Sequence, residues 1–277
     1  MAFKFISKKN EDTRTHEVTE QERSLILNPD TDFDTVETYK AIRTNIMFSM
    51  PKTDKGKIVA VTSAAPNEGK STTTVNLALT FAQMGAKVIL VDGDLRKSRV
   101  HRYLNIPRGD GVTNVLCGFS TLEDTIQHNV RDGLDILTAG AVPPNPAELL
   151  ASEEFEHMVA QLREMYDYVF IDTSPIPVVT DASFIVRVSD GAVVIVRQDV
   201  TTYDQFETAL DYTKKTGTKI LGVIVLGVRE KNRKYYYSKR GKYAYRYGYA
   251  DATKKAVEEA EKAKNEKKTE KKDESKN

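Results

Sequence analysis

A short loop between an apolar run and an amphipathic stretch is the first feature of the sequence that could perform chemistry. Residues 62–85 read TSAAPNEGKSTTTVNLALTFAQMG, with GKST at the start of the amphipathic part. Backbone N–H groups at a helix N-terminus favour anions. We therefore expect Lys70 to bind the β- and γ-phosphates of a nucleotide and Ser71 to hold Mg²⁺. The strict phosphate-loop pattern requires glycine where this chain has Ala64. The alternative is a glycine-containing turn that starts a helix and binds nothing.

Three aspartates follow two apolar runs. VILVDGDLRKS contains Asp92 and Asp94, and YDYVFIDTSPIP contains Asp172. In an open α/β sheet, ligands bind just outside the carboxyl ends of the strands. Mg²⁺ takes oxygen ligands and keeps several waters, so not every carboxylate needs to contact it directly. One aspartate at a strand end is usually a helix cap or a turn residue. Three of them beside a GKST loop predict that the chain binds ATP and Mg²⁺.

The stretch KYYYSKRGKYAYRYGYA, residues 234–250, holds seven of the thirteen tyrosines in the chain, interleaved with lysine and arginine. They are Tyr235, Tyr236, Tyr237, Tyr243, Tyr245, Tyr247 and Tyr249. Tyrosine favours strands, so this stretch could be an edge strand. It could also bind nucleic acid by stacking and charge, or form an interface patch. The fourth interpretation is that the tyrosines are substrates, and the stretch alone does not choose among the four.

Short β-branched runs separated by helical stretches must position these side chains. The runs are residues 57–63, 87–92, 134–139, 168–173, 191–196 and 219–227. Apolar strands that alternate with helices are typical of a parallel sheet covered on both faces. We therefore predict a doubly wound, mostly parallel α/β domain of the P-loop NTPase class. Apolar residues at helical spacing predict a further helix over residues 35–49.

Composition divides the chain into four predicted parts. Residues 1–33 are polar and irregular, which predicts a flexible N-terminal arm. Residues 34–228 form the predicted P-loop domain, including an N-terminal oligomerisation helix, and residues 229–250 form the tyrosine-rich cluster. Residues 251–277 consist mainly of lysine, glutamate and small residues, with too little apolar surface to fold alone.

The overall composition limits the classes of protein to consider. A formal net charge of +1 does not indicate a nucleic-acid-binding protein. The single cysteine, Cys117, excludes an intrachain disulfide framework and suits a reducing cytosol. No apolar run approaches the ~18–20 residues needed to span a bilayer, and the N-terminus becomes polar too early for a signal peptide. We therefore expect a cytoplasmic protein that docks on a membrane, if at all, through a partner.

These motifs together resemble the bacterial tyrosine kinases of capsule and exopolysaccharide synthesis, of the CpsD/CapB type. The resemblance runs from about residue 34 to residue 249 and rests on ETYKAIRTNIMFS, SAAPNEGKST, VILVDGDLRKS, FIDTSP and GAVPPNPAELLAS. A tyrosine cluster just beyond the last strand matches the autophosphorylation site of that family. The resemblance implies an ATP-dependent protein-tyrosine kinase that phosphorylates its own C-terminal tyrosines in trans and regulates polysaccharide synthesis and export.

The resemblance also implies a role for each matching residue. Asn67, Glu68, Gly69, Lys70, Ser71 and Thr72 would bind the nucleotide, with Thr72 at the inner phosphate. Asp92 would accept or orient the hydroxyl proton of an incoming tyrosine. Asp94 and Asp172 would position the metal together with Ser71 and Asp92. Arg96 would add positive charge near the transferring phosphoryl group, which suits a reaction that needs alignment and charge stabilisation.

Two positions depart from the family pattern. The asparagine that recognises adenine is replaced by Leu226, so we expect weaker discrimination between ATP and GTP. The N-terminal Glu-Arg-Arg pattern, which packs subunits into a ring, is present as Glu37, Lys40 and Arg43. Because lysine lacks the bidentate fork of arginine, we expect a looser ring.

The partners that the resemblance implies are all proteins. A separate membrane-bound activator of the polysaccharide co-polymerase type would hold the kinase at the inner face of the plasma membrane. A cognate tyrosine phosphatase would reverse the phosphorylation. The chain would form a homo-oligomeric ring, an octamer by resemblance, and no nucleic-acid partner is expected.

The main alternative is a P-loop ATPase of the ParA/MinD type, which acts as a partitioning or scaffold switch. Those enzymes carry a signature lysine five residues before the phosphate-loop lysine, where this chain has Ala65. Relatives with iron–sulfur clusters need paired cysteines, which this chain lacks. The kinase interpretation is therefore favoured.

Overall fold

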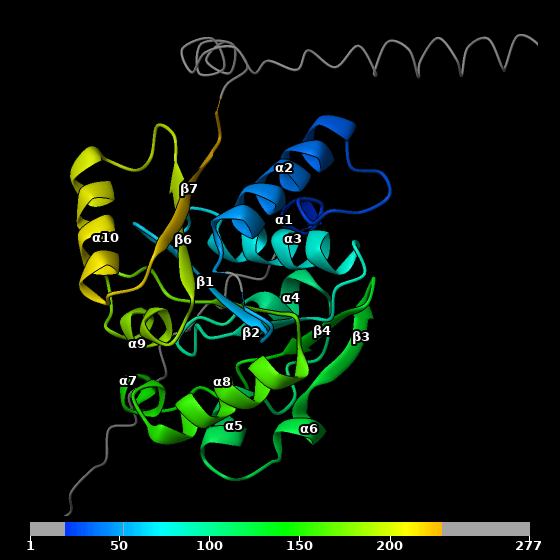
Figure 1. The fold of residues 1–277 in the computed structure, drawn as a ribbon, viewed down its shortest axis with the longest axis vertical. Helices are drawn as coiled ribbons and strands as arrows, with labels where there is room; N and C mark the ends of the chain where they lie inside the picture. The colour runs from blue at the N-terminus through cyan, green and yellow to red at the C-terminus, as the bar shows by residue number, and fades with distance from the viewer. Residues whose placement is uncertain (1–19, 52, 229–277) are drawn as a thin grey trace, which may run out of the picture. The chain divides into compact units, whose positions relative to one another are not determined.

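The computed structural model describes residues 20–51 and 53–228, drawn as a ribbon in Figure 1. The strands form one sheet in the order β3-β4-β2-β5-β1-β6-β7. They are β1 (Lys57–Ser63), β2 (Val88–Asp92), β3 (Gln127–Arg131), β4 (Leu134–Leu137), β5 (Tyr168–Asp172), β6 (Gly191–Arg197) and β7 (Ile220–Leu226). The helices are α1 (Glu20–Arg23), α2 (Phe33–Ser49), α3 (Lys70–Ala82), α4 (Val100–Tyr103), α5 (Val112–Leu116), α6 (Leu122–Thr125), α7 (Pro146–Leu150), α8 (Glu153–Met165), α9 (Asp181–Arg187) and α10 (Tyr203–Lys215).

The strand pairs confirm the predicted doubly wound, mostly parallel sheet. Every neighbouring pair is parallel except β3–β4. Each of the six predicted runs forms one of the parallel strands. No helix among the described residues is long and apolar enough to cross a membrane. The tyrosine cluster and the charged segment after it, residues 229–277, lie outside the described residues, as do residues 1–19.

Strand β3 is absent from the predicted strands. Its sequence, QHNVR, is mostly polar, and none of its residues is buried, because it forms the outer edge of the sheet. A hairpin turn joins it to β4, with Asp132 at φ 51° and Gly133 at φ 81°. Two-residue hairpin turns favour this Asp-Gly pair because both positions need positive φ. That dipeptide was the only local signal for the strand.

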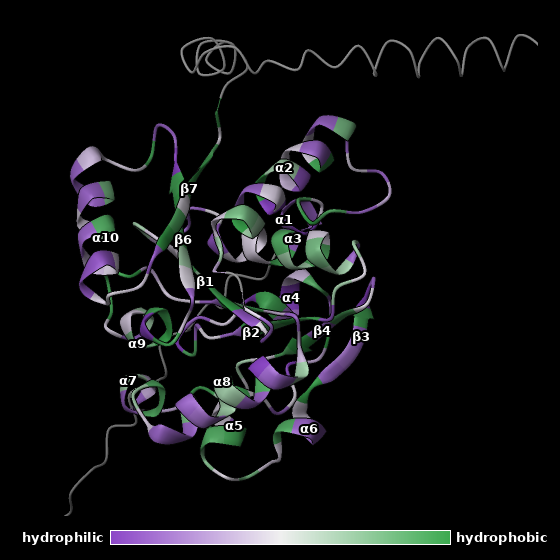
Figure 2. Ribbon diagram, viewed as in Figure 1, coloured by the Kyte–Doolittle hydropathy of each residue, from purple (hydrophilic) through white to green (hydrophobic). Residues whose placement is uncertain are grey.

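Helices cover both faces of the sheet because successive residues of a strand point to opposite sides. In β1, Ile58 and Ala60 belong to the apolar cluster of α8 and α9, whereas Val59 and Val61 belong to that of α3. Figure 1 shows α2, α3 and α4 on one side and α8, α9 and α10 on the other. In Figure 2, α8 and α10 alternate between hydrophilic and hydrophobic residues, as expected for helices with one buried face.

The predicted flexible arm, residues 1–33, is too long. Ile26 and Leu27 are buried, and Ile26 belongs to the apolar cluster on the face of the sheet that α3 covers. Asn76 of α3 fixes this segment: its Oδ1 accepts from Leu27 N at 2.8 Å and its Nδ2 donates to Leu25 O at 2.9 Å. Three consecutive apolar residues, Leu25, Ile26 and Leu27, in an otherwise polar stretch are too short a pattern to predict this packing.

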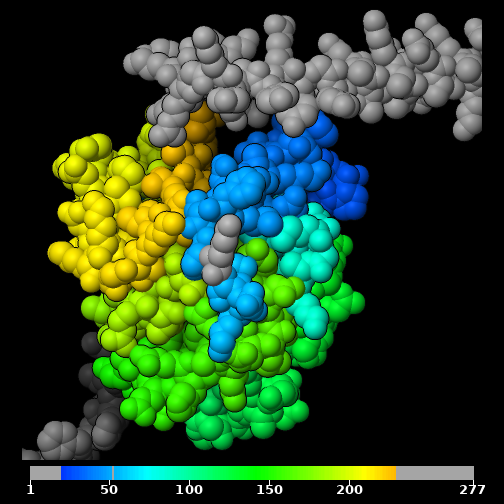
Figure 3. All heavy atoms as spheres, viewed as in Figure 1, coloured from blue at the N-terminus to red at the C-terminus, as the bar shows by residue number. Residues whose placement is uncertain are grey.

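Helix α2 begins two residues earlier than predicted. Asp32 caps it, with a side-chain oxygen that accepts from Thr35 N at 2.9 Å. At its other end, Ser49 O accepts a hydrogen bond from Lys219 Nζ at 2.8 Å, next to the start of β7. Figure 3 shows α2, in blue, beside the orange segment that includes β7. Helix α2 therefore packs at the β7 edge of the sheet.

Candidate functional site

The loop between β1 and α3 forms the phosphate-loop geometry that the sequence predicts. Asn67 and Gly69 adopt positive φ, 63° and 88°, and α3 begins at Lys70. The backbone angle of Gly69 favours glycine, and a Cβ there would lie 2.8 Å from Leu226 Cδ1, at the end of a flexible side chain. The loop therefore places backbone N–H groups at the N-terminus of a 13-residue helix, where the dipole favours an anion.

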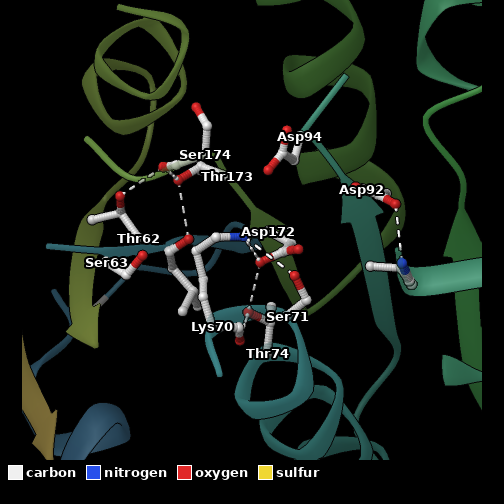
Figure 4. A network of polar contacts seen from close by, with 12 residues as sticks. Thr62, Ser63, Lys70, Ser71, Thr74, Asp92, Asp94, Asp172, Thr173 and Ser174 are labelled. Atoms are coloured by element: carbon white, nitrogen blue, oxygen red, sulfur yellow. Dashed lines mark hydrogen bonds and ion pairs between the residues drawn. The ribbon is translucent and has the colours of Figure 1, made fainter. Parts of the chain in front are cut away.

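Lys70 forms a buried ion pair with Asp172 at the centre of the site (Figure 4). Its Nζ lies 2.7 Å from Asp172 Oδ1 and donates to Ser71 Oγ at 3.3 Å. Thr74 Oγ1 lies 3.1 Å from the same Oδ1. The side chain of Lys70 is 8% exposed and that of Asp172 is 1% exposed. The carboxylate thus neutralises the lysine that the sequence assigns to phosphates.

The aspartates meet at the carboxyl edge of the sheet. Asp92 and Asp172 are register partners on adjacent parallel strands, and Asp94 follows two residues after Asp92. Figure 4 shows Lys70, Ser71 and Asp172 pointing toward one another, with Asp92 on the side toward α4. There Asp92 Oδ2 accepts from Val100 N at 3.2 Å. Asp94 Oδ1 accepts from Lys97 N at 2.9 Å.

Two buried carboxylate oxygens at this edge have no hydrogen-bond partner in the described structure: Asp92 Oδ1 and Asp172 Oδ2. Unpaired buried oxygens are costly, and a cation with its waters would satisfy them. Within residues 20–51 and 53–228, no three acidic, histidine or cysteine side chains are arranged to hold a metal ion alone. Mg²⁺ usually takes only one or two carboxylates and completes its shell with phosphate oxygens and water.

Burial and like charge govern the ionisation of the two aspartates. Burial raises the pKa of Asp92 well above its ordinary value, and the neighbouring Asp172 and Asp94 raise it further. Burial also raises the pKa of Asp172, but Lys70 opposes that shift through its charge and hydrogen bond. Asp92 therefore holds a proton more readily than an exposed aspartate.

Arg96 forms an ion pair with Asp181 that was not predicted from the sequence. Its Nε lies 2.6 Å from Asp181 Oδ2 and its Nη2 donates to Asp181 Oδ1 at 3.0 Å. Asp181, at the start of α9, is 2% exposed, whereas Arg96 is 43% exposed. This bidentate pair ties the loop after β2 to α9 and occupies the guanidinium that was assigned to the phosphoryl group.

The other residues predicted to bind the nucleotide, Asn67, Glu68 and Thr72, differ in how far their side chains are exposed. Asn67 is exposed in the loop, and Thr72 is half-buried in the first turn of α3. Glu68 is 1% exposed, and its carboxylate accepts from Ala65 N at 2.8 Å and from Thr201 Oγ1. The Glu68 side chain is therefore turned into the protein. No local pattern in the sequence points to Thr201.

The predicted oligomerisation residues on α2 make contacts within the chain. Lys40 Nζ lies 2.8 Å from Glu37 Oε1, one turn earlier, and both side chains are 45% exposed. Arg43 Nη1 donates to Thr80 O at 2.7 Å. Two of the three residues are thus exposed on α2, and the third joins α2 to α3.

A mostly parallel sheet with a phosphate loop after its interior strand β1, and with aspartates at the ends of β2 and β5, defines a P-loop nucleotide-binding domain. The family model for an AAA domain matches residues 56–219. "Tyrosine-protein kinase YwqD" of Bacillus subtilis (strain 168) is 40% identical over 215 residues, which cover 78% of this chain and 87% of that protein. "Putative tyrosine-protein kinase CapB" of Staphylococcus aureus is 36% identical, over 73% of this chain and 88% of the relative.

Solved structures agree with these relatives. The kinase domain of Escherichia coli tyrosine kinase ETK has a TM-score of 0.67 at 32% identity, covering 77% of this chain and 80% of that chain. The chimerical protein CapA2B2 has a TM-score of 0.65 at 35% identity, covering 78% and 90%. The septum site-determining protein MinD of Pyrococcus horikoshii OT3, complexed with Mg-ADP, has a TM-score of 0.55 at 26% identity, covering 64% and 73%. The chain therefore belongs to the bacterial tyrosine-protein kinases, which transfer a phosphoryl group from ATP to protein tyrosine.

Proposed function

We propose that this chain binds ATP and Mg²⁺ at the phosphate loop and phosphorylates the tyrosines of its own C-terminal cluster in trans. The observation that carries the proposal is the buried Lys70–Asp172 pair beside the unpartnered oxygens of Asp92 and Asp172. A lysine neutralised by an aspartate can exchange that partner for a phosphate. The Mg-ADP complex of the related MinD supports the same ligand here.

The site residues divide the work of phosphoryl transfer. Lys70 and the loop N–H groups would hold the phosphates in line, and Ser71, Asp94 and Asp172 would hold the metal. Bound Mg²⁺ would neutralise charge on the phosphate oxygens. Asp92, whose pKa is raised by burial, would accept the hydroxyl proton of the incoming tyrosine. Arg96 would reach the phosphates only by releasing Asp181, so we propose that it acts after a movement of the loop that follows β2.

The C-terminal cluster would be the substrate because it combines many tyrosines with charge of one sign. Residues 229–249 contain eight basic residues and one acidic residue, Glu230. Asp92, Asp94 and Asp172 lie at the carboxyl edge of the sheet, and their carboxylates would attract a basic tail to the active site of a neighbouring copy. Phosphorylation would remove that attraction.

Assembly and partners follow from family membership. We propose that Glu37, Lys40 and Arg43 contribute to a homo-oligomeric ring, an octamer by resemblance, in which tails reach neighbouring sites. A membrane-bound activator would hold the kinase at the inner face of the plasma membrane, where it would regulate capsule or exopolysaccharide synthesis. The chimerical relative CapA2B2 supports a protein partner of this kind. A cognate tyrosine phosphatase would remove the phosphates from the C-terminal tyrosines.

The test is incubation of the purified protein at high concentration with Mg-ATP, followed by mapping of phosphotyrosine by mass spectrometry. Lys70→Met and Asp92→Asn are run beside the wild type. Phosphate on Tyr235–Tyr249 in the wild type alone is the expected result. ATP turnover without phosphotyrosine, even after addition of the cytosolic segment of a candidate activator, would instead support a partitioning-type ATPase.

A further inference from the structure

Glu68 places a negative charge inside the loop that is proposed to bind a triphosphate. Its side chain is buried, and its Oε2 accepts from Ala65 N at 2.8 Å, three residues earlier in the same loop. A carboxylate facing the phosphates would repel them, so its orientation matters for binding. Hydrogen bonds to this carboxylate must therefore keep it directed away from the nucleotide.

The second contact of the carboxylate comes from a distant segment. Thr201 Oγ1 donates to Glu68 Oε1, although the two residues are 133 positions apart. The same hydroxyl oxygen accepts from Arg197 N at 2.8 Å. The Thr201 hydroxyl thus bonds both within the loop after β6 and to the phosphate loop.

The loop after β6 is also fixed to the end of β7. Gln198 N donates to Leu226 O at 2.9 Å, and Leu226 Cδ1 lies 2.8 Å from the position of a Cβ on Gly69. Three segments, the phosphate loop, residues 197–201 and the end of β7, therefore meet around Glu68 and Gly69. The Thr201 hydroxyl is the link between the first two.

We propose that Thr201 is a positioning residue of the nucleotide site, which keeps the Glu68 carboxylate directed away from the phosphates. This inference rests on the proposed binding of ATP at the phosphate loop. Without the hydroxyl, a buried carboxylate loses one of its two hydrogen bonds and gains from turning toward solvent or toward a cation. The negative charge of Glu68 then repels the phosphates of the nucleotide. The affinity for ATP falls more than the affinity for ADP, because ATP carries more negative charge.

The experiment measures the dissociation constants of a non-hydrolysable ATP analogue and of ADP, with Mg²⁺, by calorimetry on the full chain. Thr201→Val keeps the shape and removes the hydroxyl. We expect about tenfold weaker binding of the ATP analogue, equal to about 1.4 kcal/mol, and a smaller loss for ADP. Thr201→Ser keeps the hydroxyl and should retain the wild-type affinity. In autophosphorylation, KM for ATP should rise more than kcat falls.

Two further variants separate positioning from a loss of structure. Glu68→Gln in the Thr201→Val background removes the charge and should restore binding of the ATP analogue, which a merely structural defect would not allow. Glu68→Gln alone should bind at least as tightly as the wild type, and it tests the charge argument even if Thr201→Val does not fold. Thr208→Val is the matched control, because Thr208 lies on the exposed face of α10 and its Oγ1 donates to Asp204 O at 2.7 Å, within the same helix.

The same experiment distinguishes failure of the proposed nucleotide site from failure of the proposed role of Thr201. A wild-type chain that binds neither nucleotide overturns the proposed nucleotide site. A wild-type chain that binds both, with Thr201→Val binding equally well, overturns only the role of Thr201. Tenfold weaker binding by Glu68→Gln alone would also overturn it, because the charge would then favour the ligand.

Discussion

Asp92 faces opposed requirements for stability and for chemistry. Burial raises its pKa, so the native state binds this proton more tightly than the unfolded chain does. Native stability therefore falls as pH rises from the ordinary aspartate value, about 4, through the raised pKa. The proposed role of Asp92 as proton acceptor needs the ionised form, so this residue would destabilise the metal-free fold at the pH where it is proposed to act.

Asp92→Asn should therefore stabilise the metal-free protein near neutral pH while abolishing tyrosine phosphorylation. The gain should disappear below about pH 4, where the unfolded chain is also protonated. Urea unfolding across pH, beside a phosphorylation assay, measures both effects. Asp94→Asn is the control, because Asp94 is only partly buried and an asparagine can still accept from Lys97 N. A destabilised Asp92→Asn protein at neutral pH would contradict this account.

Lys70→Met should cost stability as well as activity. Removing one partner of a buried ion pair leaves an uncompensated charge, with a typical penalty of about 3–5 kcal/mol, and Asp172 is 1% exposed. Adding Asp172→Asn should recover most of the free energy of unfolding but none of the activity. Lys55→Met, which breaks an ion pair that is more than 60% exposed on both sides, should change stability by less than about 1 kcal/mol. Equal decreases in the free energy of unfolding for Lys70→Met and Lys55→Met would refute the prediction.

Leu226 stands beside the phosphate loop with an apolar side chain, so we expect it to affect the choice of nucleotide. We expect the wild type to discriminate weakly between ATP and GTP, and Leu226→Asn to increase the preference for ATP by supplying an amide that can bond to the base. Titrations of both nucleotides give the ratio of dissociation constants. Leu226→Ala shortens the side chain without adding an amide and should leave that ratio unchanged. A strong ATP preference in the wild type would refute the expectation.

At the scale of elements, α3 does more than present the phosphate loop. Its Asn76 fixes the backbone of residues 25–27, and Arg43 of α2 donates to its Thr80 O. Its Phe81 packs on Phe170 of β5, with ring centroids 5.0 Å apart. The helix that begins at Lys70 therefore holds the N-terminal segment, α2 and the sheet together.

Asn76→Ala should lower the free energy of unfolding by roughly 1–3 kcal/mol, because the buried N–H of Leu27 loses its acceptor. Proteolysis should also cut residues 20–30 faster in this variant. Denaturant unfolding and limited proteolysis measure the two effects. Gln83→Ala, near the exposed end of the same helix, should behave as the wild type. Unchanged protection of the N-terminal segment would count against its anchoring by Asn76.

At the scale of the whole molecule, phosphorylation can reverse the charge of the C-terminal cluster. Each phosphotyrosine adds about −1.5 to −2 at neutral pH. Four or five such groups would offset the eight basic residues and one acidic residue between positions 229 and 249. All seven tyrosines together would make the segment acidic.

The phosphorylated chain should therefore be a smaller particle than the unphosphorylated chain, because its tail no longer binds a neighbouring site. Size-exclusion chromatography with light scattering compares the same preparation before and after treatment with a tyrosine phosphatase. The difference should shrink at high salt, since salt screens the attraction. Identical masses in the two states at low salt would contradict release by phosphorylation.

The sequence by itself determined the features that depend on neighbouring residues. The interior parallel strands follow from β-branched runs, because a strand buried on both faces must be apolar along its length. The edge strand β7 is also apolar in sequence, although most of its residues are not buried. The phosphate loop follows from GKST between a strand and a helix, and Asp92, Asp94 and Asp172 follow from their place at strand ends. Strand β3 escaped prediction because an edge strand needs no apolar pattern.

Only the tertiary structure decided which side chains pair across the sheet. Lys70 meets Asp172 over 102 positions, Arg96 meets Asp181 over 85, and Glu68 meets Thr201 over 133. These pairs depend on strand order and on the direction in which each side chain leaves its element. No local pattern encodes either property, because both arise when distant strands are packed side by side.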